Sequence, residues 1–350
     1  MLVVYIIFLL FCILISNSNT EQKSIVLAIA CIVLAYGIGY RELTWPDTRV
    51  YQLGFVNFTP NIFNYSIIAK PFGFSEKGFF FLGVLVKTFT EDYHIYFLFI
   101  GALSMFFLYK DLQKYSIYPL IGLCAYISRF FISRNLVQIR AGLAYLIVIW
   151  GIKYIHEKKM WHYILLVWFA SFIHFSAWIA LPLYFICNWI NINKKIVVWG
   201  LILAFIIGGF FQDPISSFVI DNASDLNVTT YAQGQYISEA KGLANPMIYF
   251  QSFLLLAYTF LEEKLAPVTK YYYVIRDGYF YSTLILICFC SFTALSGRTS
   301  SQFATLEFAI IPSLVYMFDK KERTFAFILL GIVLISIMYM YMPDNVRWSL

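Results

Sequence analysis

Charged residues are scarce in this sequence. Asp, Glu, Lys and Arg make up only 13% of its 350 residues, whereas 61% are hydrophobic and 20% are aromatic. Soluble domains carry about 25% charged residues, so the composition leaves no room for a soluble catalytic domain. Because the lipid interior offers no partner to backbone groups, the chain is predicted to be an all-α polytopic integral membrane protein, with a single transmembrane domain over residues 1–350.

Motifs for several common chemistries are also missing. The sequence has no P-loop and no GxSxG motif, and its four histidines form no HExxH pattern. The cysteines all lie within apolar blocks, which predicts packing residues rather than metal ligands. We therefore expect no metal, no cofactor and no nucleic-acid partner. The cysteines are Cys12, Cys31, Cys124, Cys187, Cys288 and Cys290.

Apolar blocks alternate with short basic loops, and this alternation predicts the topology. The positive-inside rule places the basic loops in the cytoplasm, at residues 110–114, 153–159, 191–195, 262–270 and 319–323. Two long polar segments, 41–75 and 212–245, then form loops on the outer side, and the second could be a lid or a solvated connection. The apolar blocks are residues 1–16, 24–40, 94–110, 117–133, 136–156, 161–190, 196–211, 246–262, 277–295, 302–318 and 323–342.

Two stretches do not fit simple crossings. Residues 76–90 are too few to cross the membrane comfortably and are predicted to form a half-helix or a re-entrant segment on the outer side. Residues 161–190 are predicted to form a hairpin of two short crossings, or a broken helix, that turns near His174–Ser176. With these two adjustments the chain makes about 12 crossings and both termini lie outside.

Three ionisable residues are expected at one depth in the membrane. Arg140 lies 13 residues from Lys153, and His174 lies 13 residues from Trp161. A helix rises about 1.5 Å per residue, so Arg140 and His174 both lie about 20 Å from the cytoplasmic surface. Glu307 lies at about 18 Å by the same rule. We expect these three side chains to share a cavity whose mouth carries Arg41, Asp47, Arg134 and Arg298.

Each of these residues also has a purely structural interpretation. Arg140 and Glu307 could be an ion pair that holds helices together, and His174 could be a hydrogen-bonded residue between helices. Arg134 and Arg298 could be anchors whose charged ends reach the lipid headgroups. The convergence of at least four cations favours an anionic ligand such as phosphate or pyrophosphate.

Several of these residues occur in an order that resembles the EpsG/Wzy-type polysaccharide polymerases of bacterial envelopes. The resemblance covers most of the chain from residue 41 to about 318. It is carried by Arg41 with Asp47-xxx-Tyr51, Glu76-x-Gly78-Phe79, the run IRAGLAYLIVIWGIKYI around Arg140, Phe172-Ile173-His174-Phe175-Ser176-Ala177 before Leu181-Pro182, and Arg298.

The resemblance implies a metal-independent membrane glycosyltransferase at the periplasmic face of the bacterial inner membrane. Such enzymes join undecaprenyl-pyrophosphate-linked repeat units into O-antigen, capsule or exopolysaccharide, and their architecture is similar to the GT-C class. Expected partners are a flippase, a chain-length regulator and the lipid bilayer itself.

Within that resemblance, residue roles follow from the chemistry of inverting transfer. Arg140, Arg298, Arg134 and Arg41 are predicted to bind the pyrophosphate, because charge develops on the leaving group. Glu76, Asp47 and His174 are the candidate bases, with His174 favoured. Tyr51 and Trp45 are predicted to line the sugar site, and Glu307 remains the candidate structural partner.

Two other functions remain open at the level of sequence. A flippase or transporter for lipid-linked oligosaccharide also needs buried cations and broken helices, although it is expected to have internal repeats and charge throughout its depth. A polysaccharide O-acyltransferase would use His174 for acyl transfer. The bias of the charged residues toward one face favours the polymerase.

The loop charges give a testable topology. Cysteines introduced at Asn57 and at Asn227 are expected to react with an impermeant thiol reagent in intact cells, and a cysteine at Lys158 is expected to react only after the membrane is opened. Labelling at Lys158 from outside would overturn the orientation.

Overall fold

Helices are the only regular elements among the residues that the structure, a computed structural model, describes, which are 1–15, 20–66, 76–211 and 241–344. The chain divides into two compact units. Residues 1–181 and 307–350 form the first unit, and residues 182–306 form the second. The structure describes residues 41–66 of the first predicted outer loop and residues 241–245 of the second. The remainder of each loop lies outside the described residues.

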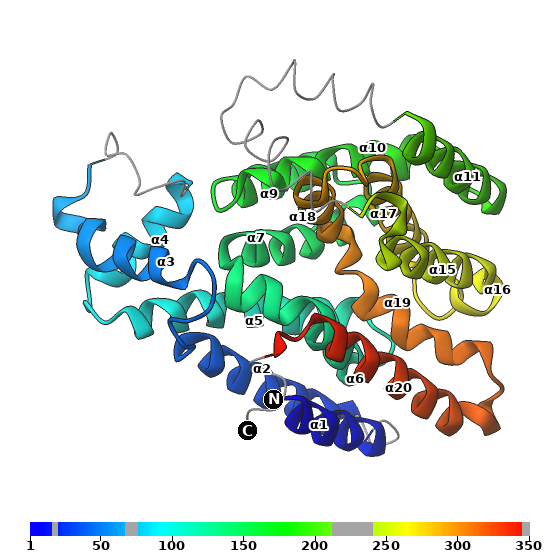
Figure 1. Cartoon of the computed structure of the whole chain (residues 1–350), viewed down its shortest axis with the longest axis horizontal. Coiled ribbons are helices and arrows are strands. Elements are labelled where there is room, and N and C mark those ends of the chain that lie inside the picture. The colour runs from blue at the N-terminus through cyan, green and yellow to red at the C-terminus, as the bar shows by residue number, and fades with distance from the viewer. Residues whose placement is uncertain (16–19, 67–75, 212–240, 345–350) are drawn as a thin grey trace. The chain divides into compact units, whose positions relative to one another are not determined.

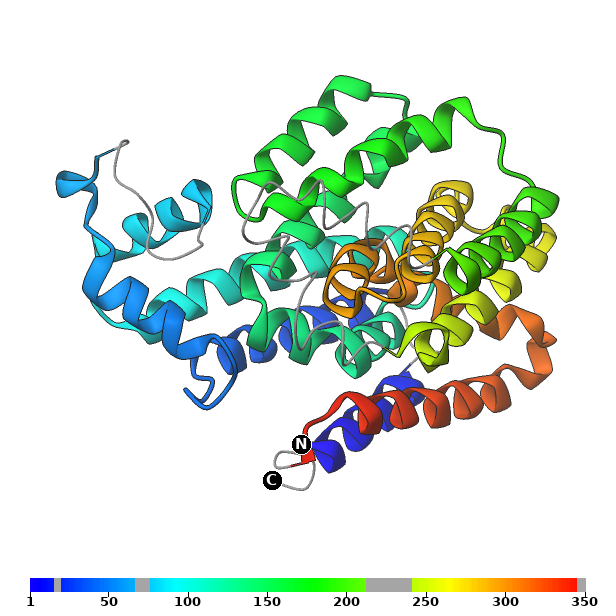
Figure 2. The ribbon, with the colours of Figure 1, turned by 45° about the horizontal axis from the view of Figure 1, so that its top comes forward.

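Most helices belong to the first unit. They are α1 (Leu2–Ile15), α2 (Thr20–Gly39), α3 (Thr48–Leu53), η1 (Gly54–Phe58), η2 (Ile62–Asn64), α4 (Lys77–Lys87), α5 (Tyr93–Tyr115), α6 (Pro119–Tyr126), η3 (Ile127–Val137), α7 (Ile139–Trp150), α8 (Ile152–His156), α9 (Met160–Ser171), η4 (Phe175–Ala180), α19 (Glu307–Ser313), η6 (Leu314–Met317), η7 (Lys320–Glu322) and α20 (Arg323–Tyr341). Helix α7 lies between α5 and α9, and α2 covers the other side of α5 (Figure 1). Helices α1 and α20 lie side by side (Figures 1 and 2).

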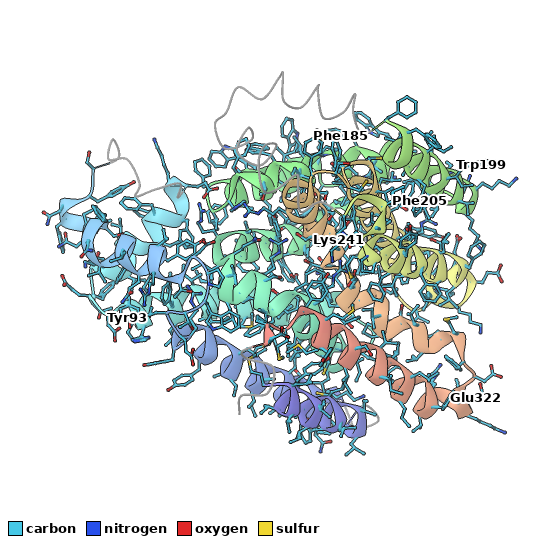
Figure 3. The ribbon with its side chains drawn as sticks, in the orientation of Figure 1. Tyr93, Phe185, Trp199, Phe205, Lys241 and Glu322 are labelled. Atoms are coloured by element: carbon cyan, nitrogen blue, oxygen red, sulfur yellow. The ribbon has the colours of Figure 1, made fainter. Side chains whose placement is uncertain are left out.

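Among the described residues, five helical stretches are long and apolar enough to cross a membrane. They are Glu21–Gly39, Tyr93–Tyr115, Pro119–Val137, Ile139–His156 and Lys320–Tyr341. Large apolar side chains also face outward in both units, as in α11 (Lys194–Phe210), where Trp199 is 68% exposed (Figure 3). Such a surface suits lipid rather than water. The chain is therefore an all-helical membrane protein, and the count of about 12 crossings and the GT-C-like arrangement stay predictions.

Both predicted irregular segments are present. Helix α4 has 11 residues, which corresponds to about 16 Å and is too short to span a bilayer. Helix α9 ends at Ser171, the backbone at His174 is extended, and a 3-10 turn begins at Phe175. We call residues 172–174, between α9 and the 3-10 turn, the interruption. It lies where the sequence predicts a break.

One irregular element was not expected. Residues 127–137 form a π-helix, η3, which begins within the apolar block 117–133, predicted as an ordinary helix, and ends four residues beyond it. Its last turn closes when the backbone N–H of Gln138 donates to the carbonyl of Ser133, at 2.9 Å. A π-helix turns the following side chains away from the direction that an α-helix would give them, and such elements are frequent at functional sites.

The second unit is built around α17. Its helices are α10 (Leu181–Trp189), α11, η5 (Gly242–Ala244), α15 (Pro246–Phe260), α16 (Glu262–Leu265), α17 (Tyr272–Cys288) and α18 (Thr293–Ala304). Helix α17 packs on α11, α15 and α18. At its first turns the buried Arg276 pairs with Asp277 at 2.8 Å and donates to the carbonyl of Ile192 at 2.5 Å.

Loops that the charge rule assigns to one side lie together within each unit. In the second unit Lys194 approaches Glu262 at 3.8 Å, which joins the loops 191–195 and 262–270. In the first unit the hydroxyl of Tyr115 donates to the carbonyl of Trp150 at 3.0 Å, next to the loops 110–114 and 153–159. Tyr93, which begins α5 beside the outer segment, and Glu322, in a basic loop, lie at opposite ends of the first unit (Figure 3).

Glu307 has a different partner from the one considered in the sequence. Its carboxylate forms a buried ion pair with Arg129 of η3, whereas Arg140 forms its ion pair with Glu76. Equal depth gives no information about which way a side chain points around its helix, and the π-helix carries Arg129 toward α19. Arg129 and Glu307 therefore connect two segments that lie far apart in the chain.

This pair provides a stability prediction. Glu307→Leu leaves the Arg129 guanidinium without its acid in a buried position, and should lower the free energy of unfolding by about 3–5 kcal/mol. The double variant Arg129→Leu/Glu307→Leu should recover most of that loss. Thermal unfolding of purified protein in detergent measures both, with the exposed Glu263→Leu as the control. A double variant no more stable than the single one would contradict the pairing.

A candidate anion-binding site

Arg140, in the first turn of α7, is the centre of a polar cluster in the first unit. Its Nη1 donates to Oε2 of Glu76 at 2.6 Å, and its Nε donates to the hydroxyl of Tyr51 at 3.4 Å. The Arg140 and Glu76 side chains are 19% and 21% exposed, so a ligand can reach them. The ring of Tyr51 in turn rests edge-on against Phe79 of α4, with the ring centroids 5.9 Å apart.

Glu76 also binds the interruption after α9. Its Oε1 accepts the backbone N–H of Phe175 at 2.8 Å. The carbonyl of Phe172 accepts the backbone N–H groups of Gly78 and Phe79, at 2.9 and 3.2 Å. The first N–H groups of a helix have no partner within it, and here the end of α9 supplies one. The start of α4 is thus fixed against the interruption.

Only glycine fits at position 78. A Cβ atom there would lie 2.6 Å from Cβ of Phe172 and 2.7 Å from its carbonyl oxygen. The backbone of Phe172 has little room to move, because its oxygen already accepts two hydrogen bonds. The pattern Glu76-x-Gly78 therefore has a physical basis: the acid binds the interruption and the glycine permits the close approach.

His174 belongs to a hydrogen-bonded chain beside Glu76. Its Nδ1 lies 2.6 Å from Oγ of Ser176 and accepts the backbone N–H of Ser176 at 3.3 Å. The same Oγ lies 2.8 Å from the hydroxyl of Tyr145 on α7. The guanidinium of Arg134 lies 5.1 Å from the centroid of the Tyr145 ring, within cation–π distance. Helix α7 therefore joins the interruption to the π-helix.

Arg41 is buried at the other side of the cluster. Its Nη1 donates to the carbonyl of Asn135 at 3.3 Å, and its guanidinium lies 4.0 Å from the centroid of the Phe97 ring. Its Nε and Nη2 have no hydrogen-bond partner among the described residues. Burial lowers the pKa of Arg41 to about 10, so the side chain keeps its charge at neutral pH. A buried cation with two unused donors favours an anionic ligand.

Tyr51 connects the two arginines. Burial raises the pKa of Tyr51, and the positive charges of Arg140 and Arg41 oppose that rise. Both guanidiniums are therefore close enough to act on one phenol. Among the described residues no group of three or more His, Cys, Asp or Glu side chains could hold a metal ion. The cluster is dominated by cations, and its donor set suits an anion.

The structure brings together most of the residues singled out in the sequence. The cluster holds six of them: Arg41, Tyr51, Glu76, Arg134, Arg140 and His174. Asp47 and Trp45 lie on the same outer segment, and the side chain of Asp47 is exposed. Asp47 has a φ of 61°, a left-handed conformation that Asp tolerates better than most residues. Arg298 lies in α18 of the second unit, so its place in this site remains a prediction.

Three members of the cluster were not predicted as site residues from the sequence. Tyr145 and Ser176 form the chain to His174, and Asn135 binds Arg41 and also accepts the hydroxyl hydrogen of Tyr126 at 2.6 Å. Ser176 had a detectable signal, because Ser is typical of the first turn after a helix break. Tyr145 lies in an apolar run and Asn135 lies between two apolar blocks, and both acquire their contacts only through packing, so neither had a signal in the sequence.

Comparison with known proteins supplies an independent finding. The sequence profile of the EpsG family matches residues 24–349, a range that includes the whole cluster. No curated protein and no solved structure matches the chain.

The contact at Gly78 can be tested by one methyl group. Gly78→Ala forces α4 away from Phe172 and should lower the free energy of unfolding by about 1–3 kcal/mol. Gly37→Ala is the matched control, because a Cβ there meets nothing within 4 Å. Thermal unfolding in detergent compares the two, and equal midpoints would show that α4 is not held against the interruption.

Proposed function

The chain belongs to the EpsG family, and we propose that it is a membrane glycosyltransferase that polymerises oligosaccharide repeat units carried on undecaprenyl pyrophosphate. Family membership indicates a membrane polysaccharide polymerase. The finer proposal is supported by the buried Arg41, which has two donor nitrogens without a hydrogen-bond partner among the described residues and lies within electrostatic range of Tyr51, the partner of Arg140.

The donor set matches a pyrophosphate. Guanidinium groups present planar pairs of N–H donors to phosphate oxygens and keep their charge when partly buried. Arg140 donates to the Tyr51 hydroxyl at 3.4 Å, and Arg41 lies within electrostatic range of the same phenol, so we expect both guanidiniums to contribute to binding the pyrophosphate. Tyr51 and the half-exposed Trp45 lie on the outer segment, where aromatic rings can pack against the sugar.

The reaction is an inverting displacement at the anomeric carbon. A hydroxyl of the incoming lipid-linked unit attacks C1 of the reducing-end sugar of the growing chain. The new C1–O bond forms while the bond from C1 to the pyrophosphate oxygen breaks, and that oxygen leaves with the electron pair. The arginines stabilise the charge that develops on the leaving group.

The attacking hydroxyl needs a base, and Glu76 is well placed to become one. Its carboxylate neutralises Arg140 in the structure, at 2.6 Å. A pyrophosphate that binds Arg140 competes for the same donors and releases one carboxylate oxygen. Glu76 then accepts the proton of the hydroxyl. The exposed Asp47 is the second candidate.

The cellular setting follows from the same proposal. The cluster is built from α3, the start of α4, the first turn of α7, η3 and the break after α9, and the loop charges assign this end to the periplasmic side of the bacterial inner membrane. A flippase would deliver the lipid-linked units, and a chain-length regulator would act on the product. A deletion strain separates the two functions. Loss of the polymerase leaves single repeat units at the cell surface, whereas loss of a flippase leaves none.

Arg140→Lys tests the grip on pyrophosphate. Lys keeps the charge but loses the planar fork, so long-chain glycan should fall by at least tenfold while the protein still inserts and folds. Arg49→Lys is the matched control, because Arg49 is exposed on the neighbouring α3. The glycan is resolved on a gel from cells that make each variant at equal protein level. Normal polymer from Arg140→Lys would place the site elsewhere.

A further inference from the structure

Helix α3, together with the turn η1 that continues it, has two contrasting sides. On the inner side the hydroxyl of Tyr51 accepts a hydrogen bond from Arg140, and Thr48 and Phe55 are buried. A helix turns by about 100° per residue, so Leu53 projects from the side opposite Tyr51. Leu53 is exposed there. One short helix therefore contacts the anion cluster on one side and presents an apolar side chain on the other.

Large apolar side chains continue from α3 onto the neighbouring turns. Helices α3 and α4 lie beside each other (Figure 1), and Nζ of Lys87 in α4 donates to the carbonyl of Val56 in η1 at 3.0 Å. The backbone N–H of Ile62 in η2 donates to Oγ1 of Thr88, just after α4, at 3.0 Å. We call five side chains on these joined elements, which are between 40% and 88% exposed, the outer apolar face: Val50, Leu53, Val56, Phe63 and Phe89.

A membrane-crossing role does not account for the outer apolar face. The five stretches of the described chain that are long and apolar enough to cross a membrane include none of α3, η1, η2 and α4. Phe63 and Phe89 are nevertheless the most exposed members of the face. A joined set of exposed apolar side chains marks a surface that binds an apolar partner.

The substrate of the proposed function has an apolar part that begins at the anion cluster. Its pyrophosphate is bonded to a polyprenyl chain, so this chain starts next to the phosphate oxygens that Arg140 would bind. A helix with its side chains is only about 10 Å across. A polyprenyl chain that starts beside Tyr51 therefore needs only to pass around α3 to reach Leu53. Continuity with the anion cluster thus favours this chain as the occupant of the face.

We propose that the outer apolar face binds the polyprenyl chain of the lipid-linked substrate while Arg140 and Tyr51 hold its pyrophosphate. The inference rests on the proposed function. Apolar contact along the chain adds to the binding energy of the phosphates, because each buried methylene group contributes separately. The face also gives the carrier lipid a path from the outer leaflet to the arginines.

Two pyrophosphates that differ only in chain length test the face. Geranyl pyrophosphate is too short to pass around α3 and lie along the face, whereas undecaprenyl pyrophosphate is long enough. The double variant Val50→Ser/Leu53→Ser should bind undecaprenyl pyrophosphate about tenfold more weakly than the natural protein, and geranyl pyrophosphate equally well. Its thermal midpoint should be unchanged, because both side chains are exposed. The dissociation constants are measured on the full-length protein in nanodiscs, with empty nanodiscs subtracted.

A matched control separates the face from ordinary contact with lipid. Ile32 and Val33 are exposed on α2, within a stretch that can cross the membrane. The double variant Ile32→Ser/Val33→Ser should bind both pyrophosphates like the natural protein. Unchanged affinity of Val50→Ser/Leu53→Ser for undecaprenyl pyrophosphate would overturn the inference. An equal loss for both pyrophosphates would also overturn it, because the substitutions would then act on the anion cluster.

A photoreactive residue in place of Leu53 identifies the occupant directly. In nanodiscs that contain undecaprenyl pyrophosphate, we expect an adduct with that lipid, and excess geranyl pyrophosphate should reduce it by competing for the arginines. Adducts with phospholipid alone, or with a second copy of the chain, would overturn the inference.

The proposed function is tested separately, by adding lipid-linked repeat units to the natural protein. Binding that depends on chain length, without any extension of these units, would overturn the polymerase and leave a surface that binds polyprenyl chains. Extension of the units by a protein whose adducts contain only phospholipid would support the polymerase and overturn the inference.

Discussion

The ion pair between Arg140 and Glu76 is the interaction on which the site depends. Arg140 belongs to a helix packed deep in the first unit, and Glu76 immediately precedes the short helix α4. Glu76 also accepts the Phe175 N–H group, so a single carboxylate joins three segments that are distant in the sequence. A charge this far from bulk water is costly without a partner, and the partners here also fix the geometry.

The distribution of charge around this pair is unequal. Three guanidiniums, from Arg41, Arg134 and Arg140, lie in the connected cluster, whereas one described carboxylate, that of Glu76, pairs with them. Such an excess of positive charge is unfavourable in a partly buried region unless an anion completes it. This balance of charge is the physical basis for the proposal that the cluster binds an anion, because guanidiniums bind phosphate oxygens well.

Sequence reasoning predicted the type and length of several segments, but it did not predict the direction in which side chains point around each helix. The composition was enough to predict an all-helical membrane protein. The lengths of the apolar segments were enough to predict the short α4 and the interruption at His174. Helical rise placed Arg140 and Glu307 at one level, but it could not show that the π-helix gives Glu307 to Arg129. The Tyr145–Ser176–His174 chain was equally hidden, because it depends on which faces of α7 and the interruption meet.

The bonds between the start of α4 and the end of α9 also constrain the order in which this protein can mature. Glu76 and Phe175 are 99 residues apart in the chain. During synthesis the first N–H groups of α4 leave the ribosome long before Phe172 and Phe175 exist. They remain bound to water or to lipid headgroups until α9 inserts. Helix α4 is therefore completed by a later part of the chain, and the anion site cannot form before the ribosome has passed the interruption.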